Sequence, residues 1–150
     1  MYKTILVPID GSSHAEKALT VAVQLARGSG ASLCLLTVTE YPPDDIGVFI
    51  GGVNVPIPEA ERKKLTEEIS ETAQKLIDQA RSAVELEGIE VKEVVRPGHP
   101  AEQIIKVAEA QGADAIVMGS RGLGNIRGMV FGSVSQKVSH TAKCSVITVT

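Results

Sequence analysis

Five short aliphatic runs recur along the chain, and each has the length of a β-strand. They are Lys3–Pro8, Ala31–Thr39, Glu90–Val95, Asp114–Met118 and Ser145–Val149. The first two runs are apolar almost without interruption, which is typical of strands whose two faces are both covered. The run Glu90–Val95 instead alternates charged and aliphatic residues, which predicts an edge strand.

Helical periodicity fills the intervals between these runs. In the first interval the apolar positions are Ala15, Ala18, Leu19, Ala22, Leu25 and Ala26. Ser13 and Glu16 fit a capping box at the start of this first helix, and Gly28 supplies its end.

A second helix is predicted from Glu59 to about Glu87 and ends at Gly88. Its apolar stripe consists of Leu65, Ile69, Ala73, Leu76, Ala80 and Ala83. A third helix runs from Pro100 to Gly112, since proline favours the first helical position. The last helix is predicted from about Gly132 to His140.

Two segments break the periodicity. Residues 41–58 hold four prolines and three glycines, which predicts a long loop. A loop of this length in a compact domain is more often a lid or a binding loop than a plain connection. Residues 119–131 form a second, glycine-rich loop between a strand and a helix.

The order of the elements predicts the fold class. Strands that alternate regularly with helices indicate an α/β protein with an open parallel sheet, helices on both faces and right-handed crossovers. The whole chain, 1–150, is expected to be one domain. Ligands of such sheets bind beyond the carboxyl ends of the strands, where the strand order reverses. Those ends are residues 8–11, 38–40 and 118–122.

Composition excludes several functions. Lys plus Arg number 15 and Asp plus Glu number 18, a net charge of −3, which argues against broad contact with nucleic acid or with an anionic membrane. Aromatic residues make up only 3%, so a base-stacking platform is not expected. No apolar stretch is long enough to cross a bilayer, and the chain is expected to be cytoplasmic, with Cys34 and Cys144 as free thiols.

The strongest chemical pattern is Gly119-Ser120-Arg121-Gly122, nine further residues, and then Gly132-Ser133 before the last helix. Glycines let backbone amides turn inward, and a helix amino terminus carries free N–H groups and partial positive charge, so this region suits a phosphate chain. The plainer alternative is that Ser133 only caps the helix and the glycines only turn the loop. The Walker pattern is absent, because no lysine stands at the required position, and the GxGxxG fingerprint also fails.

These residues resemble a known family, the universal stress proteins, and specifically their ATP-binding branch. The resemblance covers nearly the whole chain and is carried by ILVPIDGS at residues 5–12, DAIVMGSRG at residues 114–122 and GSVS at residues 132–135. The branch carries the pattern GxxGx9G[ST], which Gly119, Gly122, Gly132 and Ser133 satisfy. The resemblance implies an adenine nucleotide alpha hydrolase-like fold whose five strands lie in the order 3-2-1-4-5.

The resemblance also implies a binding site for ATP. Pro8 and Asp10 would border adenine and ribose, and Val38 would hold the base. Met118 and Gly119 would line the far wall, and Arg121 and Gly122 would approach the phosphates. The phosphates would be bound by amides and hydroxyls of Gly132, Ser133, Val134 and Ser135. Asp10 is alternatively expected to position a divalent ion through water, and Mg²⁺ suits that role.

Family members dimerise through the last strand, so a homodimer through Ser145–Val149 is expected, with higher assembly left open. The family often has proline where this chain has Ser145. Three functions remain open. One is an ATP-dependent regulatory module that changes the binding of a protein partner. The others are a slow ATP hydrolase and an interaction protein with a vestigial site. No set of nucleophile, base and orienting acid can be assembled, and His14, His99 and His140 show no metal-ligand spacing.

Overall fold

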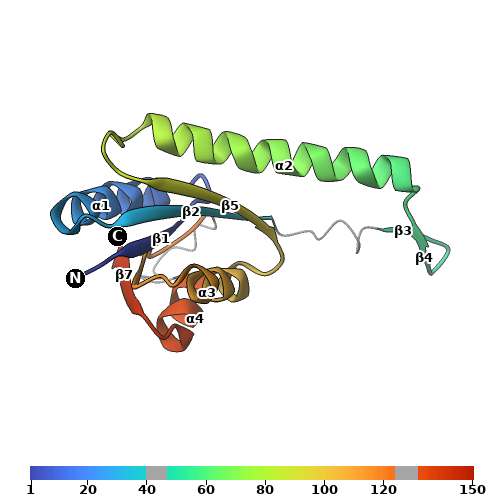
Figure 1. Cartoon of the computed structure of the whole chain (residues 1–150). Coiled ribbons are helices and arrows are strands. Elements are labelled where there is room, and N and C mark those ends of the chain that lie inside the picture. The colour runs from blue at the N-terminus through green and yellow to red at the C-terminus, as the bar shows by residue number, and fades with distance from the viewer. Residues whose placement is uncertain (40–46, 124–131) are drawn as a thin grey trace.

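The computed structural model describes residues 1–39, 47–123 and 132–150. Its elements are β1 (Thr4–Pro8), α1 (Ser13–Ser29), β2 (Ser32–Thr39), β3 (Gly47–Ile50), β4 (Val53–Pro56), α2 (Glu59–Ser82), β5 (Val91–Pro97), α3 (Pro100–Gln111), β6 (Ala115–Gly119), α4 (Ser133–Thr141) and β7 (Ser145–Val149). Figure 1 shows the main sheet between two layers of helices, with a small hairpin, β3–β4, far from it. In this described part of the chain no helix is long and apolar enough to span a membrane.

The main sheet has the order β5-β2-β1-β6-β7, and all its neighbouring strands are parallel. Numbered by themselves along the chain, these five strands lie in the order 3-2-1-4-5, as the sequence predicted. The α/β class and the parallel sheet are therefore confirmed. The charged strand β5 is an edge strand, and β7 is the other edge.

The two faces of the sheet carry separate apolar cores, because side chains alternate along each strand. In β1, Ile5 and Val7 point into a core with Leu19 of α1 and Ile77 of α2. Leu6, between them, belongs to a second core with α3 and α4 residues such as Ile104 and Val138. All three strand residues are fully buried. This double cover leaves the carboxyl edge of the sheet as the place where a pocket can open.

Several element boundaries differ from the sequence prediction. The cap of α1 is Ser12, whose hydroxyl accepts the Ala15 N–H at 3.1 Å, and not Ser13, which is the first helical residue. The helix runs through Gly28 and ends at Gly30, which adopts the left-handed conformation. Helix α2 ends at Ser82, five residues before the predicted end, and Gly88 lies in a turn beyond it.

The other predicted bounds are wrong by two residues or fewer. Strand β5 begins at Val91 and continues to Pro97, β6 runs from Ala115 to Gly119, and α4 begins one residue after Gly132. The predicted apolar stripe of α2 is only partly correct. Ala73 and Ala80 are buried together with Ile77, which the stripe omitted, whereas Leu65 and Ile69 are only half-buried.

The prediction that residues 41–58 form one long loop is wrong for the second half of this segment. Residues 47–56 form the antiparallel hairpin β3–β4, with Ile50 opposite Val53 and Gly51-Gly52 between them. Both glycines have positive φ, 58° and 83°, which the tight turn requires. Residues 40–46 and 124–131 lie outside the described part, so the predictions for those stretches stay untested.

Cys34 and Cys144 are both free, and they stand at opposite sides of the central strands. Cys34 is buried in β2, whereas Cys144 precedes β7, and β1 and β6 lie between these strands. Burial raises the pKa of the Cys34 thiol, because the thiolate would lose its hydration. The thiol is therefore protonated at neutral pH and packs as a small apolar side chain.

The amino-terminal ends of β1 and β6 are joined by one carboxylate. Oδ2 of Asp114 accepts the backbone N–H groups of Lys3 at 2.7 Å and of Thr4 at 2.9 Å. The Thr4 and Lys3 N–H groups hold the pKa of this carboxyl below its usual range, because they stabilise the charged form. Since the folded-state pKa is lowered, this contribution to stability is complete above the ordinary aspartate pKa of about 4 and is lost as pH falls through the folded value.

We expect Asp114→Asn to lower the thermal unfolding midpoint at pH 7, because the charged acceptor of both N–H groups is lost. The difference from wild type should shrink as the pH is lowered below about 4. Differential scanning calorimetry across pH 3–7 measures this, with the exposed Glu90→Gln as control. A difference that stays constant across this pH range would contradict the assignment.

Candidate functional site

A pocket of about 400 Å³ opens at the carboxyl ends of β1, β2 and β6. It is lined by Pro8, Ile9, Asp10, Ala15, Leu36, Val38, Pro100, Ile104, Met118, Gly119, Ser120, Arg121, Gly122, Leu123, Gly132, Ser133, Val134 and Ser135. All eleven residues predicted to bind a nucleotide are among them. The structure thus brings these residues together, while their roles toward a ligand remain predictions.

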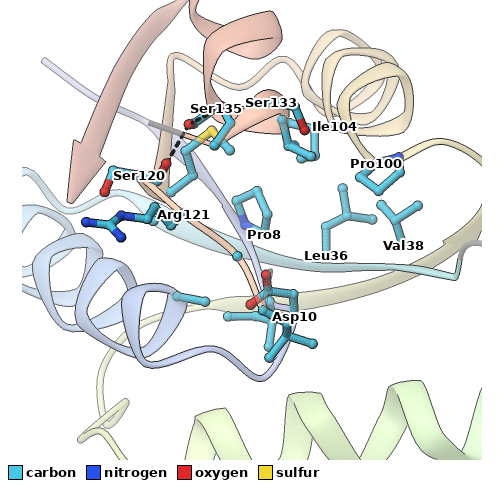
Figure 2. Close-up of a pocket in the computed structure, with 18 residues that line it drawn as sticks. Pro8, Asp10, Leu36, Val38, Pro100, Ile104, Ser120, Arg121, Ser133 and Ser135 are labelled. Carbon is cyan, nitrogen blue, oxygen red and sulfur yellow. Dashed lines mark hydrogen bonds between the residues drawn. The ribbon is translucent and has the colours of Figure 1, made fainter. Parts of the chain in front are cut away.

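One end of the pocket is apolar. Leu36 and Val38 are two residues apart on β2 and therefore point to the same face, opposite Pro100 and Ile104 of α3. Figure 2 shows these four side chains on one side of the cavity, with Pro8 near its centre. This wall suits a flat, weakly polar group such as a nucleobase.

Another part of the pocket wall is formed by the amino terminus of α4. Its N-cap is Gly132, which has no side chain, and no side-chain cap is present. The amides of Ser133, Val134 and Ser135 belong to the first turn, where an α-helix supplies no intrahelical acceptor. In the described part of the chain these amides have no side-chain cap, so they are the donors that an anion in the pocket would meet.

Two groups predicted to bind phosphate already have partners. The Gly132 N–H donates to the carbonyl oxygen of Ser120 at 2.6 Å. The Ser135 hydroxyl, buried at 2% exposure, donates to the same oxygen at 2.7 Å, as Figure 2 shows, and lies 3.0 Å from the carbonyl oxygen of Gly132. These contacts position the helix. The groups still expected to donate hydrogen bonds to a phosphate are therefore the amides of Ser133, Val134 and Ser135 and the Ser133 hydroxyl.

Among the described residues that line the pocket, Asp10 is the only one with a carboxylate. Its Oδ1 accepts the Ser12 N–H at 2.9 Å, which fixes the side chain at the end of β1. A Cβ atom on Gly122 would lie 2.8 Å from Oδ2 of Asp10. Glycine at position 122 therefore lets this carboxylate approach the loop after β6, where it faces the pocket (Figure 2).

Arg121 lines the pocket, but its side chain leads away from the apolar wall (Figure 2). In Figure 2 its guanidinium group points away from Pro8, Leu36 and Val38. Its Nε is buried and has no hydrogen-bond partner in the described structure, and neither has the Oγ of Ser120. Contact between this guanidinium and a phosphate therefore requires a different rotamer from the one seen here.

Sequence reasoning missed seven of the lining residues: Ile9, Ala15, Leu36, Pro100, Ile104, Ser120 and Leu123. Leu36 could have been found, because it precedes Val38 by two residues on the same strand. Pro100 and Ile104 could not, since only the tertiary position of α3 beside β2 brings them to the pocket.

The fold and this pocket define a doubly wound α/β protein with a pocket at the switch point of its sheet. The chain belongs to the universal stress protein family, whose model matches residues 1–150. It is 34% identical over 149 residues to the universal stress protein YxiE of Bacillus subtilis, with 99% of each chain covered.

Solved structures agree with this assignment. The structure of MJ0577, a universal stress protein of Methanocaldococcus jannaschii, matches with a TM-score of 0.80 and 30% identity, covering 99% of this chain and 96% of that one. A universal stress protein solved in complex with cAMP matches with a TM-score of 0.64 and 27% identity, covering 99% of this chain and 97% of the other.

Close backbone packing makes Gly119 sensitive to substitution. A Cβ atom there would lie 2.7 Å from Cβ of His14 and 2.9 Å from its carbonyl carbon. We expect Gly119→Ala to lower the free energy of unfolding by about 1–3 kcal/mol, because α1 and β6 must separate. The measurement is urea denaturation.

The matched control is Gly28→Ala. Gly28 lies within α1, and a Cβ atom there would have no neighbour within 4 Å. Alanine should therefore raise the free energy of unfolding by about 0.4–1 kcal/mol. Equal effects of the two substitutions would show that the packing of Gly119 against His14 is not what constrains this position.

Proposed function

We propose that the chain binds ATP in this pocket and acts as a nucleotide-dependent regulatory module of a stress response, with little or no turnover. The observation that carries the proposal is the amino terminus of α4, which has no side-chain cap and lines the pocket together with an apolar wall. A phosphate chain at the helix terminus and a base against Leu36 and Val38 would satisfy both ends at once.

The chemistry of the pocket residues supports this ligand class. Gly122 leaves room for the Asp10 carboxylate, and the pattern Gly119, Gly122, Gly132 and Ser133 frames the loop before α4. The related protein solved with cAMP carries an adenine nucleotide. Asp10 is the residue that would hold a hydrated Mg²⁺ accompanying the phosphates, because Mg²⁺ favours carboxylate oxygens and keeps its waters.

The proposed module works in the cytoplasm as a homodimer joined through β7. This strand is an edge of the sheet, and Val146 and Ile147 remain half-exposed on it. An unpaired aliphatic edge favours pairing with a second chain. Nucleotide binding would then alter the affinity for a protein partner by stabilising one arrangement of the dimer.

The helix-terminus contact can be tested by removing one amide. Proline fits the first position of α4, because Gly132 before it is extended, with φ −78° and ψ 166°. We expect Ser133→Pro to weaken ATP binding about 10- to 100-fold, the value of one charge-assisted hydrogen bond of about 1.5–3 kcal/mol. Isothermal titration calorimetry measures the affinity.

Ser133→Ala is the control, because it removes the hydroxyl and keeps the amide. Its loss of affinity should be smaller than that of Ser133→Pro, and the binding of adenosine should be unaffected by either change. Unchanged ATP affinity in a folded Ser133→Pro protein would refute the proposed phosphate site.

The alternative of slow ATP hydrolysis would need a base at the γ-phosphate, and Asp10 is the only carboxylate that the described part of the chain brings to the pocket. Its Oδ1 is already occupied by the Ser12 N–H, which ties the side chain to the start of α1. Phosphate release at saturating ATP is therefore expected to be far slower than one event per second. Faster release that Asp10→Asn abolishes would favour the hydrolase, whereas a chain that binds no adenine nucleotide would favour the vestigial site.

A further inference from the structure

The hairpin β3–β4 and the first half of α2, residues 47–71, form an arm that extends beyond the sheet (Figure 1). The hairpin holds no charged residue between positions 47 and 58. Ile50 is 61% exposed, Val53 62% and Val55 41%. These are three of the five large apolar side chains exposed in the described part of the chain.

The exposed residues share one face of the hairpin. Ile50 pairs with Val53 across the turn, and Val55 follows Val53 by two residues on the same strand. A two-stranded hairpin is only marginally stable alone in water, and monomeric proteins rarely expose a continuous apolar patch. The arm therefore has the composition of a surface that is covered by another chain.

The first half of α2 continues this surface. Leu65 and Ile69 lie one turn apart on one face of the helix and are only half-buried. The buried residues of α2, such as Ala73 and Ile77, belong to the second half, which packs on the sheet. The helix thus carries an apolar stripe into a stretch that the described part of the chain covers only in part.

A row of charged residues beside this stripe favours a second copy of the same chain. The row consists of the exposed residues Glu61, Lys64, Glu68, Glu71 and Lys75, spaced three or four apart. In an antiparallel pair of α2 helices, a two-fold axis near Glu68 places Glu61 beside the partner's Lys75. The same axis places Lys64 beside the partner's Glu71.

Glu68 meets its own copy at the axis, which is the one unfavourable approach in this arrangement. The start of α2 lies nine residues from the axis, about 14 Å at 1.5 Å per residue. Each hairpin therefore reaches the second half of the other copy's α2. We propose that the arm is a self-association surface, on which a second copy packs with its α2 antiparallel and covers the apolar face of the hairpin.

This contact is separate from pairing through β7. The arm lies on the α2 and β5 side of the sheet, whereas β7 is the opposite edge. Association through β7 alone would give wild type and all arm variants the same mass. Charge changes on α2 therefore report on the arm alone.

The test uses two charge-reversed forms of the full chain. Lys64→Glu with Lys75→Glu makes the row entirely acidic, and Glu61→Lys with Glu68→Lys and Glu71→Lys makes it entirely basic. Each form alone should sediment as a smaller species than wild type, because like charges oppose one another across the axis. A 1:1 mixture should recover the wild-type mass, which a misfolded variant cannot do.

The matched control is Lys63→Glu with Glu67→Lys, which exchanges two charges on the side of the helix away from Leu65 and Ile69 and should leave the mass unchanged. Ile50→Ser with Val53→Ser should reduce the mass as the charge reversals do. Masses unaffected by all of these changes would overturn the proposal. Membrane binding by the hairpin would also overturn it. In that case wild-type protein would pellet with phosphatidylcholine vesicles, and only the variant Ile50→Ser with Val53→Ser would fail to pellet.

Discussion

The carbonyl oxygen of Ser120 fixes where α4 begins, and the pocket depends on this position. The oxygen accepts the Gly132 N–H at 2.6 Å and the Ser135 hydroxyl at 2.7 Å. The N–H of Ser120 donates to the carbonyl oxygen of Val149 at 2.8 Å, so the residue is also tied to β7. Because one residue joins β7 to the first turn of α4, the helix terminus is held in place before any ligand arrives. A preorganised donor set binds without the cost of ordering it.

Gly119 and Gly122 of the site serve close approach and not backbone conformation. The glycines with positive φ are at positions 11, 30, 51, 52, 88, 98 and 112, and the described motif glycines Gly119, Gly122 and Gly132 are not among them. At Gly119 a side chain would strike His14, and at Gly122 it would strike the Asp10 carboxylate. The motif therefore has glycine at the positions where the chain at the end of β6 contacts α1 and the end of β1. A helix cap such as Gly30 is glycine for the unrelated reason of its left-handed conformation.

The fold could be predicted because the buried strands and amphipathic helices have distinct periods, and the topology of α/β proteins is restricted. The errors have local causes. Ser12 and Ser13 are both competent caps, and only the chain path chooses Ser12. The hairpin was missed because prolines around Gly51-Gly52 outweighed the aliphatic residues beside the turn. Pro100 and Ile104 were missed because a pocket wall depends on how α3 lies against β2.

The arm exists because α2 is longer than the sheet it packs on. A helix of 24 residues spans about 36 Å, whereas the eight residues of β2 span about 26 Å. The second half is anchored by Ala73 and Ile77 in the core and by Glu93 of β5, which binds Arg81 at 3.2 Å and Gln74 at 2.8 Å. The described part of the chain covers the first half only in part, and yet this half keeps apolar residues beside a row of both charge signs. A helix end exposed only to water would gain nothing from Leu65 and Ile69, whereas a helix that meets its own copy uses both the stripe and the charges.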